Sequence, residues 1–203
     1  LDNNRVNQHT IASYFARTHL RNGVLLGGSE QQILASADLK PAHLEQERSR
    51  VLPKQLASIV QSCWRVGGDE FLGFTEQKVK LGMFALLAER LINCKTLEDV
   101  FTQTAAFYTI TGDQLQFANT KRGTQVSISL NANFKPKRQH STPNSLLSEL
   151  LLLVCHRFSS WLVGQVIPLL RVEMQHVKPA HHEEYRLMYP CPCSYQNNNN
   201  ALV

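Results

Sequence analysis

The fold is decided by residues 171–203, which read RVEMQHVKPAHHEEYRLMYPCPCSYQNNNNALV. Apolar residues that alternate with polar ones predict a strand over 171–177, and a second short strand is predicted over 192–195. Between them, residues 180–189 are predicted to form a short helix, and the asparagine run at 197–200 is typical of a polar loop. A strand, a helix and a strand in this order favour an α+β fold.

The residues before this stretch predict a β-hairpin and a long helix. Beyond Gly112 the spacing of apolar residues changes from that of a helix to strict alternation, and residues 119–123 supply a turn. A helix is predicted over 146–165. The sheet part is therefore expected to have the order β-β-α-β-α-β, with a small antiparallel sheet covered by the long helix. The side chains expected to face inward from that helix are Leu147, Leu150, Leu151, Val154, Phe158, Trp161 and Leu162.

Helical spacing dominates the first half of the sequence. Apolar residues recur roughly every three or four positions, and glycine or proline marks the ends of several segments. We therefore predict a mainly helical part over 1–111 and a sheet part over 112–203, both within a single domain of 203 residues. The predicted helices cover 6–21, 29–37, 41–50, 53–66, 81–92 and a segment that begins at Thr96.

Composition and charge narrow the class of protein. The sequence is 43% hydrophobic and 18% charged, as in ordinary globular proteins, and its net charge of +5 indicates a mildly basic surface. Five cysteines, an odd number, without a signal peptide favour a reducing compartment, so a cytoplasmic location is expected. The longest apolar run, 146–163, is interrupted by Glu149, His156 and Arg157, so no membrane span and no membrane partner are expected.

Three blocks of residues carry a family resemblance through their order and spacing. The blocks are FLGF at 71–74 with LGMFALL at 81–87, TLEDVF at 96–101 with FY at 107–108, and His176, Pro179, Tyr185, Cys191-Pro192 and NALV at 200–203. Together they resemble the N-terminal sensor domain of AraC/XylS-type transcription regulators. The subfamily is the one labelled arabinose-binding, whose sensor is not the cupin type of the arabinose regulator itself.

The resemblance implies a cytoplasmic regulator that responds to a small-molecule effector and whose sensor domain often also forms a homodimer. In such regulators a C-terminal helix-turn-helix domain reads DNA. That pair of helices is absent from this sequence, so we expect the chain to reach DNA only through such a domain. An effector that binds one conformation better than another would shift how the DNA-binding domain is presented.

Two other classes of function compete with this reading. One is a non-catalytic oligomerisation or interaction module that has no small-molecule ligand; a tight small-molecule complex would distinguish the two. The other is an enzyme, but no nucleophile and base stand in a recognisable pattern. We therefore predict that the chain is not an enzyme and needs no cofactor.

Two motifs suggest other chemistry. Residues 67–71, GGDEF, spell the signature of diguanylate cyclases, but they follow an amphipathic helix rather than a strand, and glycines before Asp and Glu are an ordinary helix stop. A second group contains residue types that bind zinc, yet its Cys-x-Cys spacing differs from the usual C-x₂-C pair. We expect neither cyclase activity nor a metal site. The residues of the second group are His176, His181, His182, Cys191 and Cys193.

A sensor needs an apolar cavity with a few well-placed polar groups. His156 and Arg157 interrupt the longest apolar helix, so one of them is expected to bind a polar group of the effector, for example a carboxylate. The alternative is that both face solvent or satisfy a carbonyl group. Aromatic residues on inward helix faces are expected to line the cavity, with plain core packing as the alternative. These are Trp64, Phe84, Phe107, Tyr108 and Trp161.

Overall fold

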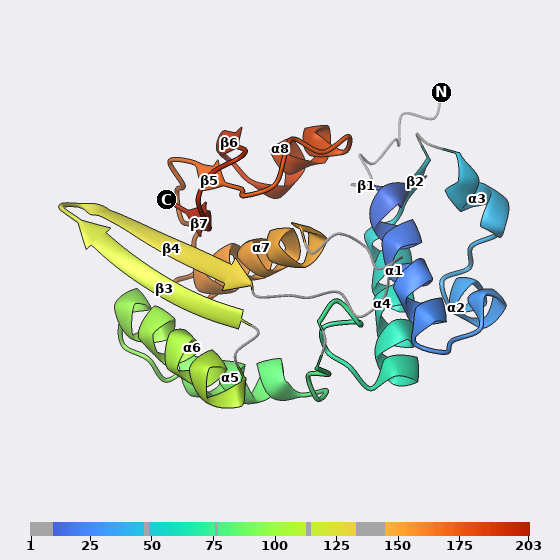
Figure 1. Cartoon of the computed structure of the whole chain (residues 1–203), viewed down its shortest axis with the longest axis horizontal. Coiled ribbons are helices and arrows are strands. Elements are labelled where there is room, and N and C mark those ends of the chain that lie inside the picture. The colour runs from blue at the N-terminus through green and yellow to red at the C-terminus, as the bar shows by residue number, and fades with distance from the viewer. Residues whose placement is uncertain (1–9, 47–48, 76, 113–114, 133–144) are drawn as a thin grey trace, which may run out of the picture. The chain divides into compact units, whose positions relative to one another are not determined.

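The computed structural model describes residues 10–46, 49–75, 77–112, 115–132 and 145–203. Helices and strands are both present in this part of the chain, so the fold is α+β, as predicted (Figure 1). The chain divides into two compact units. The first unit comprises residues 1–74 and 78–81, and the second comprises residues 75–77 and 82–203. The single-domain organisation expected from the sequence stays a prediction.

The first unit is mainly helical. α1 packs against α4, and the two helices approach closely because Gly23 has no side chain: a Cβ atom there would lie 2.5 Å from Sγ of Cys63. The Cys63 thiol donates to the carbonyl oxygen of His19, at 3.2 Å. The elements are β1 (Ile11–Ala12), α1 (Ser13–Leu25), α2 (Glu30–Ser36), α3 (Pro41–Glu45), β2 (Arg50–Val51) and α4 (Pro53–Gly67).

The first helix differs from its predicted bounds. Residues 6–9 lie outside the described residues, Ile11–Ala12 pair antiparallel with Arg50–Val51, and α1 begins only at Ser13. α1 then continues through Gly23, where the prediction placed its end. Gly23 serves helix packing rather than helix termination, and the sequence pattern does not separate these two uses. By contrast α4 ends where predicted, with Gly68 in the left-handed region at φ 57°.

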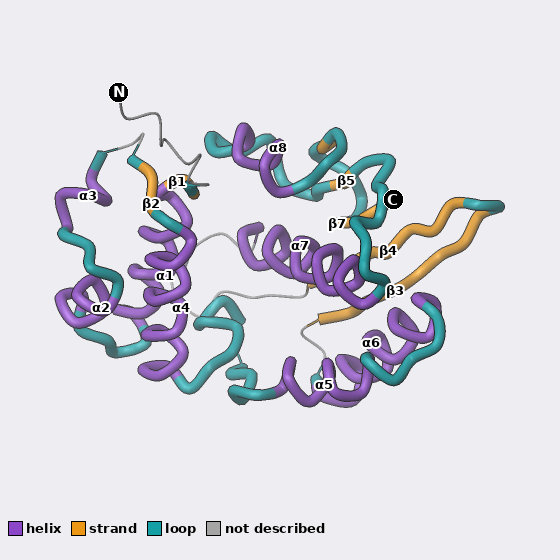
Figure 2. The backbone as a smooth tube through the Cα atoms, turned by 180° about the vertical axis from the view of Figure 1, so that it is seen from behind, coloured by secondary structure: helices purple, strands orange, loops and turns teal. Residues whose placement is uncertain are grey.

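The second unit combines a five-stranded sheet with helices. α6 packs against β3, while α7 packs against β4 and β7 (Figure 2). The sheet order is β3-β4-β7-β5-β6. All neighbouring pairs are antiparallel except β5 and β6, which are parallel. The elements are α5 (Met83–Leu91), α6 (Leu97–Thr111), β3 (Leu115–Arg122), β4 (Gln125–Ala132), α7 (Ser145–Leu162), β5 (Val172–Glu173), the 3₁₀ helix η1 (His182–Glu184), α8 (Tyr185–Met188), β6 (Cys193–Ser194) and β7 (Asn200–Leu202).

The asparagine-rich end forms a strand that the sequence pattern did not predict. β7 lies in the middle of the sheet between β4 and β5, and its three residues are buried. Asn200 is accommodated there because its amide is paired: Oδ1 accepts from the backbone N–H of Gln175 at 2.9 Å, and Nδ2 donates to Oε1 of Gln175 at 2.8 Å. Burial of a polar side chain is tolerated when its hydrogen bonds are made.

The buried face of α7 also differs from the prediction. Val154 and Trp161, expected to face inward, are exposed, whereas Glu149 and His156 are buried. Both buried polar side chains have partners on other segments, as described below. The prediction placed only apolar side chains on the buried face of α7. It was therefore wrong about which face of this helix is buried.

Candidate functional site

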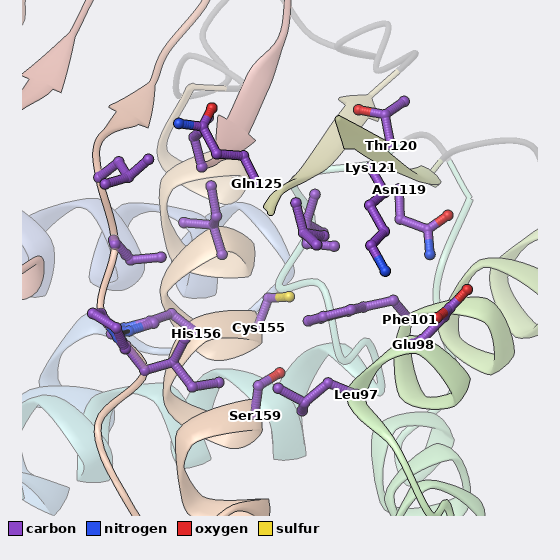
Figure 3. A pocket seen from close by; sticks show the side chains of 18 of the residues that line it. Leu97, Glu98, Phe101, Asn119, Thr120, Lys121, Gln125, Cys155, His156 and Ser159 are labelled. Carbon is purple, nitrogen blue, oxygen red and sulfur yellow. Dashed lines mark hydrogen bonds between the residues drawn. The ribbon is translucent and has the colours of Figure 1, made fainter. Parts of the chain in front are cut away.

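The second unit contains a cavity of about 760 Å³ between α6, α7 and the sheet (Figure 3). α6 and α7 form two of its walls, β3, β4 and their turn form a third, and the segment after α7 together with β7 closes it. This volume lies within the range of small-molecule sites. The lining residues are Leu97, Glu98, Phe101, Asn119, Thr120, Lys121, Thr124, Gln125, Val126, Ile128, Cys155, His156, Ser159, Ile167, Pro168, Leu169, Leu170, Leu202 and Val203.

His156 holds the segment that closes the cavity. Its Nε2 lies 2.8 Å from the carbonyl oxygen of Ile167, and because a carbonyl oxygen only accepts, Nε2 carries the proton. One turn further along α7, the Ser160 hydroxyl accepts from the backbone N–H of Ile167 at 3.1 Å. Two hydrogen bonds therefore fix Ile167 to α7. The His156 ring is 2% exposed and Nδ1 has no hydrogen-bond partner among the described residues.

A second set of hydrogen bonds fixes the other end of this segment. The backbone N–H of Leu170 donates to the carbonyl oxygen of Val203 at 2.7 Å, and the backbone N–H of Val203 donates to the carbonyl oxygen of Arg171 at 3.0 Å. Leu170 and Val203 both line the cavity. The wall of the cavity is therefore continuous with the last strand of the sheet.

Cys155 brings a thiol to the cavity wall beside His156. Burial raises the pKa of this thiol to about 12, so it is protonated and uncharged at neutral pH. A thiol that is protonated at neutral pH is a poor nucleophile and a poor metal ligand. Cys155 therefore contributes a small apolar surface to the site.

Of the residues predicted to bind a ligand, His156 lines this cavity and six do not. Arg157 is exposed and donates to the carbonyl oxygen of Met188 at 3.3 Å. Trp64 belongs to the first unit, where its indole N–H donates to the carbonyl oxygen of Glu70 at 3.1 Å. His156 and Arg157 thus each contact a backbone carbonyl group, which was the alternative expected for these two side chains.

The remaining predicted aromatic residues make ring contacts with one another and with their neighbours. Phe84 meets Phe158 edge to face, with ring centroids 5.4 Å apart, and Trp161 stacks on Phe158 at 5.7 Å. Phe107 and Tyr108 are 5.5 Å apart, and Tyr108 lies 5.2 Å from Phe117. These are packing distances for aromatic side chains. A role in ligand binding stays a prediction for these four residues.

Sequence reasoning missed most of the cavity wall. Leu97, Phe101 and Cys155 stand at ordinary apolar helix positions, and nothing in their spacing distinguishes a cavity wall from a core. The segment 167–170 was not assigned to any element. The one usable signal was the pair of polar residues in the longest apolar helix, and it led to His156.

The GGDEF stretch forms a turn built around a buried carboxylate. Asp69 is buried, and its Oδ1 accepts from the backbone N–H groups of Phe71 and Val79 at 3.0 and 2.9 Å. Its Oδ2 accepts from the backbone N–H of Gly73 at 2.8 Å. The carboxylate is thus used to satisfy backbone donors of its own loop.

Two of the three histidines of the zinc-type group, His176 and His181, lie beside a buried glutamate, whereas His182 pairs with Glu183. Glu149 is 0% exposed, and its Oε2 lies 3.2 Å from Nε2 of His181. Nε2 of His176 lies 3.3 Å from Oε1, an ion-pair distance without hydrogen-bond geometry. The phenol of Tyr189 donates to the carbonyl oxygen of Glu149 at 2.8 Å. Within the described ranges no three such side chains stand close enough to hold a metal ion.

The helices that the structure describes include none with the length and apolar character needed to cross a membrane.

The comparison with known families agrees with this architecture. Residues 27–203 match the family model described as the arabinose-binding domain of AraC transcription regulator, N-term. The match includes all elements of the second unit and every residue that lines the cavity. No significant match to the chain is found among curated proteins. The chain therefore belongs to the family of N-terminal arabinose-binding domains of AraC transcription regulators, and is a regulatory sensing domain.

Proposed function

We propose that this domain binds a small-molecule effector in the cavity between α6, α7 and the sheet, and that the full-length regulator uses this binding to control transcription. The observation that carries the proposal is the cavity itself, of about 760 Å³, inside a domain of a ligand-sensing family. The effector is bound without turnover, so the domain is not an enzyme. Of the seven residues that the sequence predicted to bind a ligand, only His156 belongs to the wall of the proposed site.

The cavity wall offers a route for the signal. Leu170 and Val203 line the cavity and are joined by a backbone hydrogen bond of 2.7 Å. The family description makes this an N-terminal domain, and on that ground we place the DNA-binding part of a full-length regulator after β7. An effector that fits one arrangement of Leu170 and Val203 better than another shifts the population toward that arrangement. DNA is then contacted only through the C-terminal domain.

A thermal-shift screen of small molecules tests the proposal. A compound at about 100 times its Kd stabilises the folded state by about 2.7 kcal/mol, which corresponds to a rise in Tm of several degrees. Cys155→Phe fills the cavity and should abolish the shift. The matched control is Cys94→Phe, because Cys94 is also a half-buried free cysteine but does not line the cavity.

The outcome is decided by the comparison of variants. A compound that stabilises the wild type and the Cys94→Phe variant, but not the Cys155→Phe variant, supports the proposal. Equal stabilisation of all three proteins would place binding elsewhere and contradict it. If Cys155→Phe melts far below the wild type without ligand, Leu170→Asp replaces it as the test variant, because Leu170 is 58% exposed.

We further propose that the domain forms a homodimer through apolar side chains that α5 and α6 leave exposed. Ile110 is 84% exposed on α6, and Leu86 of α5 is also exposed. α5 packs against α6, and exposed apolar side chains on adjoining helices are typical of association surfaces. Sedimentation of the wild type should give a dimer that Ile110→Asp dissociates. A monomeric wild type would contradict dimerisation, and a dimer that no compound stabilises would favour the oligomerisation module without a ligand.

A further inference from the structure

The polar side chains that α6 and the hairpin contribute to the cavity lie at its rim, whereas seven of its ten Leu, Ile, Val, Phe and Pro residues are buried or half-buried. The polar residues of α6 and of the β3–β4 hairpin that line it are all exposed. In Figure 3, Asn119, Thr120 and Lys121 lie on the hairpin, apart from the α7 residues Cys155, His156 and Ser159. More than half of the lining residues are Leu, Ile, Val, Phe or Pro. An effector inside the cavity therefore meets mainly hydrocarbon.

The polar side chains of the interior are few, and none of them is a carboxylate, an ammonium or a guanidinium group. The Nε2–H of His156 is already donated to the carbonyl oxygen of Ile167, so the ring retains only Nδ1, which has no hydrogen-bond partner among the described residues. The thiol of Cys155 is neutral, because burial raises its pKa to about 12. Ser159 is the remaining interior polar residue among those that line the cavity, and it is buried. The interior thus has little capacity for hydrogen bonds to a ligand.

The two charged residues of the lining have opposite signs. Glu98 and Lys121 are both exposed at the rim. Their charges offset one another and are screened by solvent. An anion or a cation taken into the interior would lose its hydration without gaining a buried partner of opposite charge, which is unfavourable.

A sugar is also poorly matched to this interior. A pentose carries four hydroxyl groups, and each one that leaves water without a new hydrogen bond lowers affinity. Sites that select polyols therefore need several placed polar groups. The interior offers too few of them for a pentose.

We propose that the effector of this domain is an uncharged, mainly apolar molecule, bound with its hydrocarbon part between Phe101, Cys155 and Leu170 and its polar group at the rim. This inference rests on the proposed function, since it names the class of ligand for the same cavity. It assigns a ligand unlike the pentose in the family's description. The volume of about 760 Å³ is sufficient for a molecule of drug size.

A fluorescence experiment with defined probes tests the ligand class. N-phenyl-1-naphthylamine is uncharged and apolar, and its emission rises when it leaves water. Bound probe is then challenged with 1-decanol, with decanoate, which has the same chain but a negative charge, and with L-arabinose. We expect 1-decanol to displace the probe at concentrations at least about tenfold lower than decanoate, and L-arabinose not to displace it.

Two leucine variants locate the probe. Leu170→Asp places a carboxylate on the cavity wall, whereas Leu187→Asp places the same group on α8, outside the cavity. Leu170 and Leu187 are 58% and 66% exposed, so neither change buries a charge in the folded core. Leu170→Asp should weaken probe binding by about tenfold or more, and Leu187→Asp should leave it unchanged.

Each failure has a distinct meaning. L-arabinose or decanoate could displace the probe better than 1-decanol, and Leu170→Asp could weaken the binding of that ligand. The proposed ligand class would then be wrong, while the proposal that an effector binds in the cavity would stand. If the probe binds equally to both variants, it occupies another surface and the inference is overturned. The neutral probes could also fail to bind while the thermal-shift screen finds polar compounds that stabilise the wild type but not Cys155→Phe. In that case the proposed ligand class is wrong, and effector binding in the cavity still stands.

Discussion

His156 and Ile167 are joined by a hydrogen bond of 2.8 Å between Nε2 of the imidazole and the backbone carbonyl oxygen. The bond connects the middle of α7 to the segment that closes the cavity, eleven residues further along the chain. The sequence suggested His156 as a residue that binds the effector, but its Nε2–H holds the wall of the cavity instead. The shape of the cavity depends on this bond, and the first prediction follows from it.

Replacement of His156 by leucine should destabilise the domain by about 1–3 kcal/mol, because it leaves the Ile167 carbonyl without its donor. The same change should weaken binding of any cavity ligand, since the wall is no longer held. Urea unfolding and ligand titration measure the two effects. Arg157→Ala is the control at the next position, where the side chain is exposed, and it should change neither quantity appreciably. Equal effects of the two substitutions would contradict the role given to His156.

Replacement of Glu149 by leucine should cost about 1–3 kcal/mol, because it removes a buried carboxylate that is a hydrogen-bond partner of His181. Glu149 is fully buried, with His181 and His176 within 3.3 Å of its carboxylate. Glu183→Leu removes exposed contacts with Arg186 and His182 and should cost less than about 1 kcal/mol. Chemical denaturation of both variants measures the difference. A Glu149→Leu variant as stable as the wild type would show that the cluster contributes nothing to folding.

Asp69→Ala should destabilise the first unit by about 3 kcal/mol or more, because three backbone N–H groups lose their acceptor. Glu89→Ala, at an exposed helix position, should change stability by less than about 0.5 kcal/mol. Thermal unfolding of the two variants gives the comparison. A wild type that converts GTP with magnesium into a cyclic dinucleotide, and loses that activity in Asp69→Ala, would contradict the structural role.

Stability should fall as the pH is lowered from 7.5 to 5, and His19 should account for about 2 kcal/mol of the loss. Burial lowers the pKa of His19 from 6.5 to about 4. Between these values the unfolded chain binds a proton that the folded chain does not, so acid favours unfolding. The stabilising effect is complete above the unfolded pKa and is lost progressively below it.

The variant His19→Leu isolates this contribution. Between pH 7.5 and pH 5 the free energy of unfolding should fall in both proteins. The fall should be about 2 kcal/mol smaller in His19→Leu than in the wild type. Urea titrations at the two pH values give the four free energies required. An unchanged pH dependence in His19→Leu would mean that the pKa of His19 is the same in the folded domain as in the unfolded chain, and would contradict the prediction.

The parts of the fold that follow from local patterns were predictable. The β3–β4 hairpin and the helix over Ser145–Leu162 appear near their predicted positions, because alternation and helical spacing are local patterns. The turn predicted over 119–123 was wrong, since residues 119–122 pair with β4 and the turn lies at Gly123 and Thr124. The end of α4 was predicted from Gly67 and Gly68, and Gly68 adopts the left-handed conformation that ends the helix. The residues that determine these elements are close together in the sequence.

The parts that depend on distant partners were not predictable. β7 is a strand because Asn200 pairs with Gln175 and because β4 and β5 flank it. The inner face of α7 contains Glu149 and His156 because histidines and a carbonyl from later segments pair with them. The cavity follows from these same long-range contacts. A pattern of apolar residues does not contain them, so it located one residue of the cavity wall and not the rest.

The most direct test of the central claim is a crystal structure of the domain with the compound that stabilises it most in the thermal-shift screen. We predict that the compound lies between α6 and α7, in contact with Phe101, Cys155 and Leu170, while the bond between His156 and Ile167 is kept. An empty cavity, with the compound bound on another surface, would contradict the account.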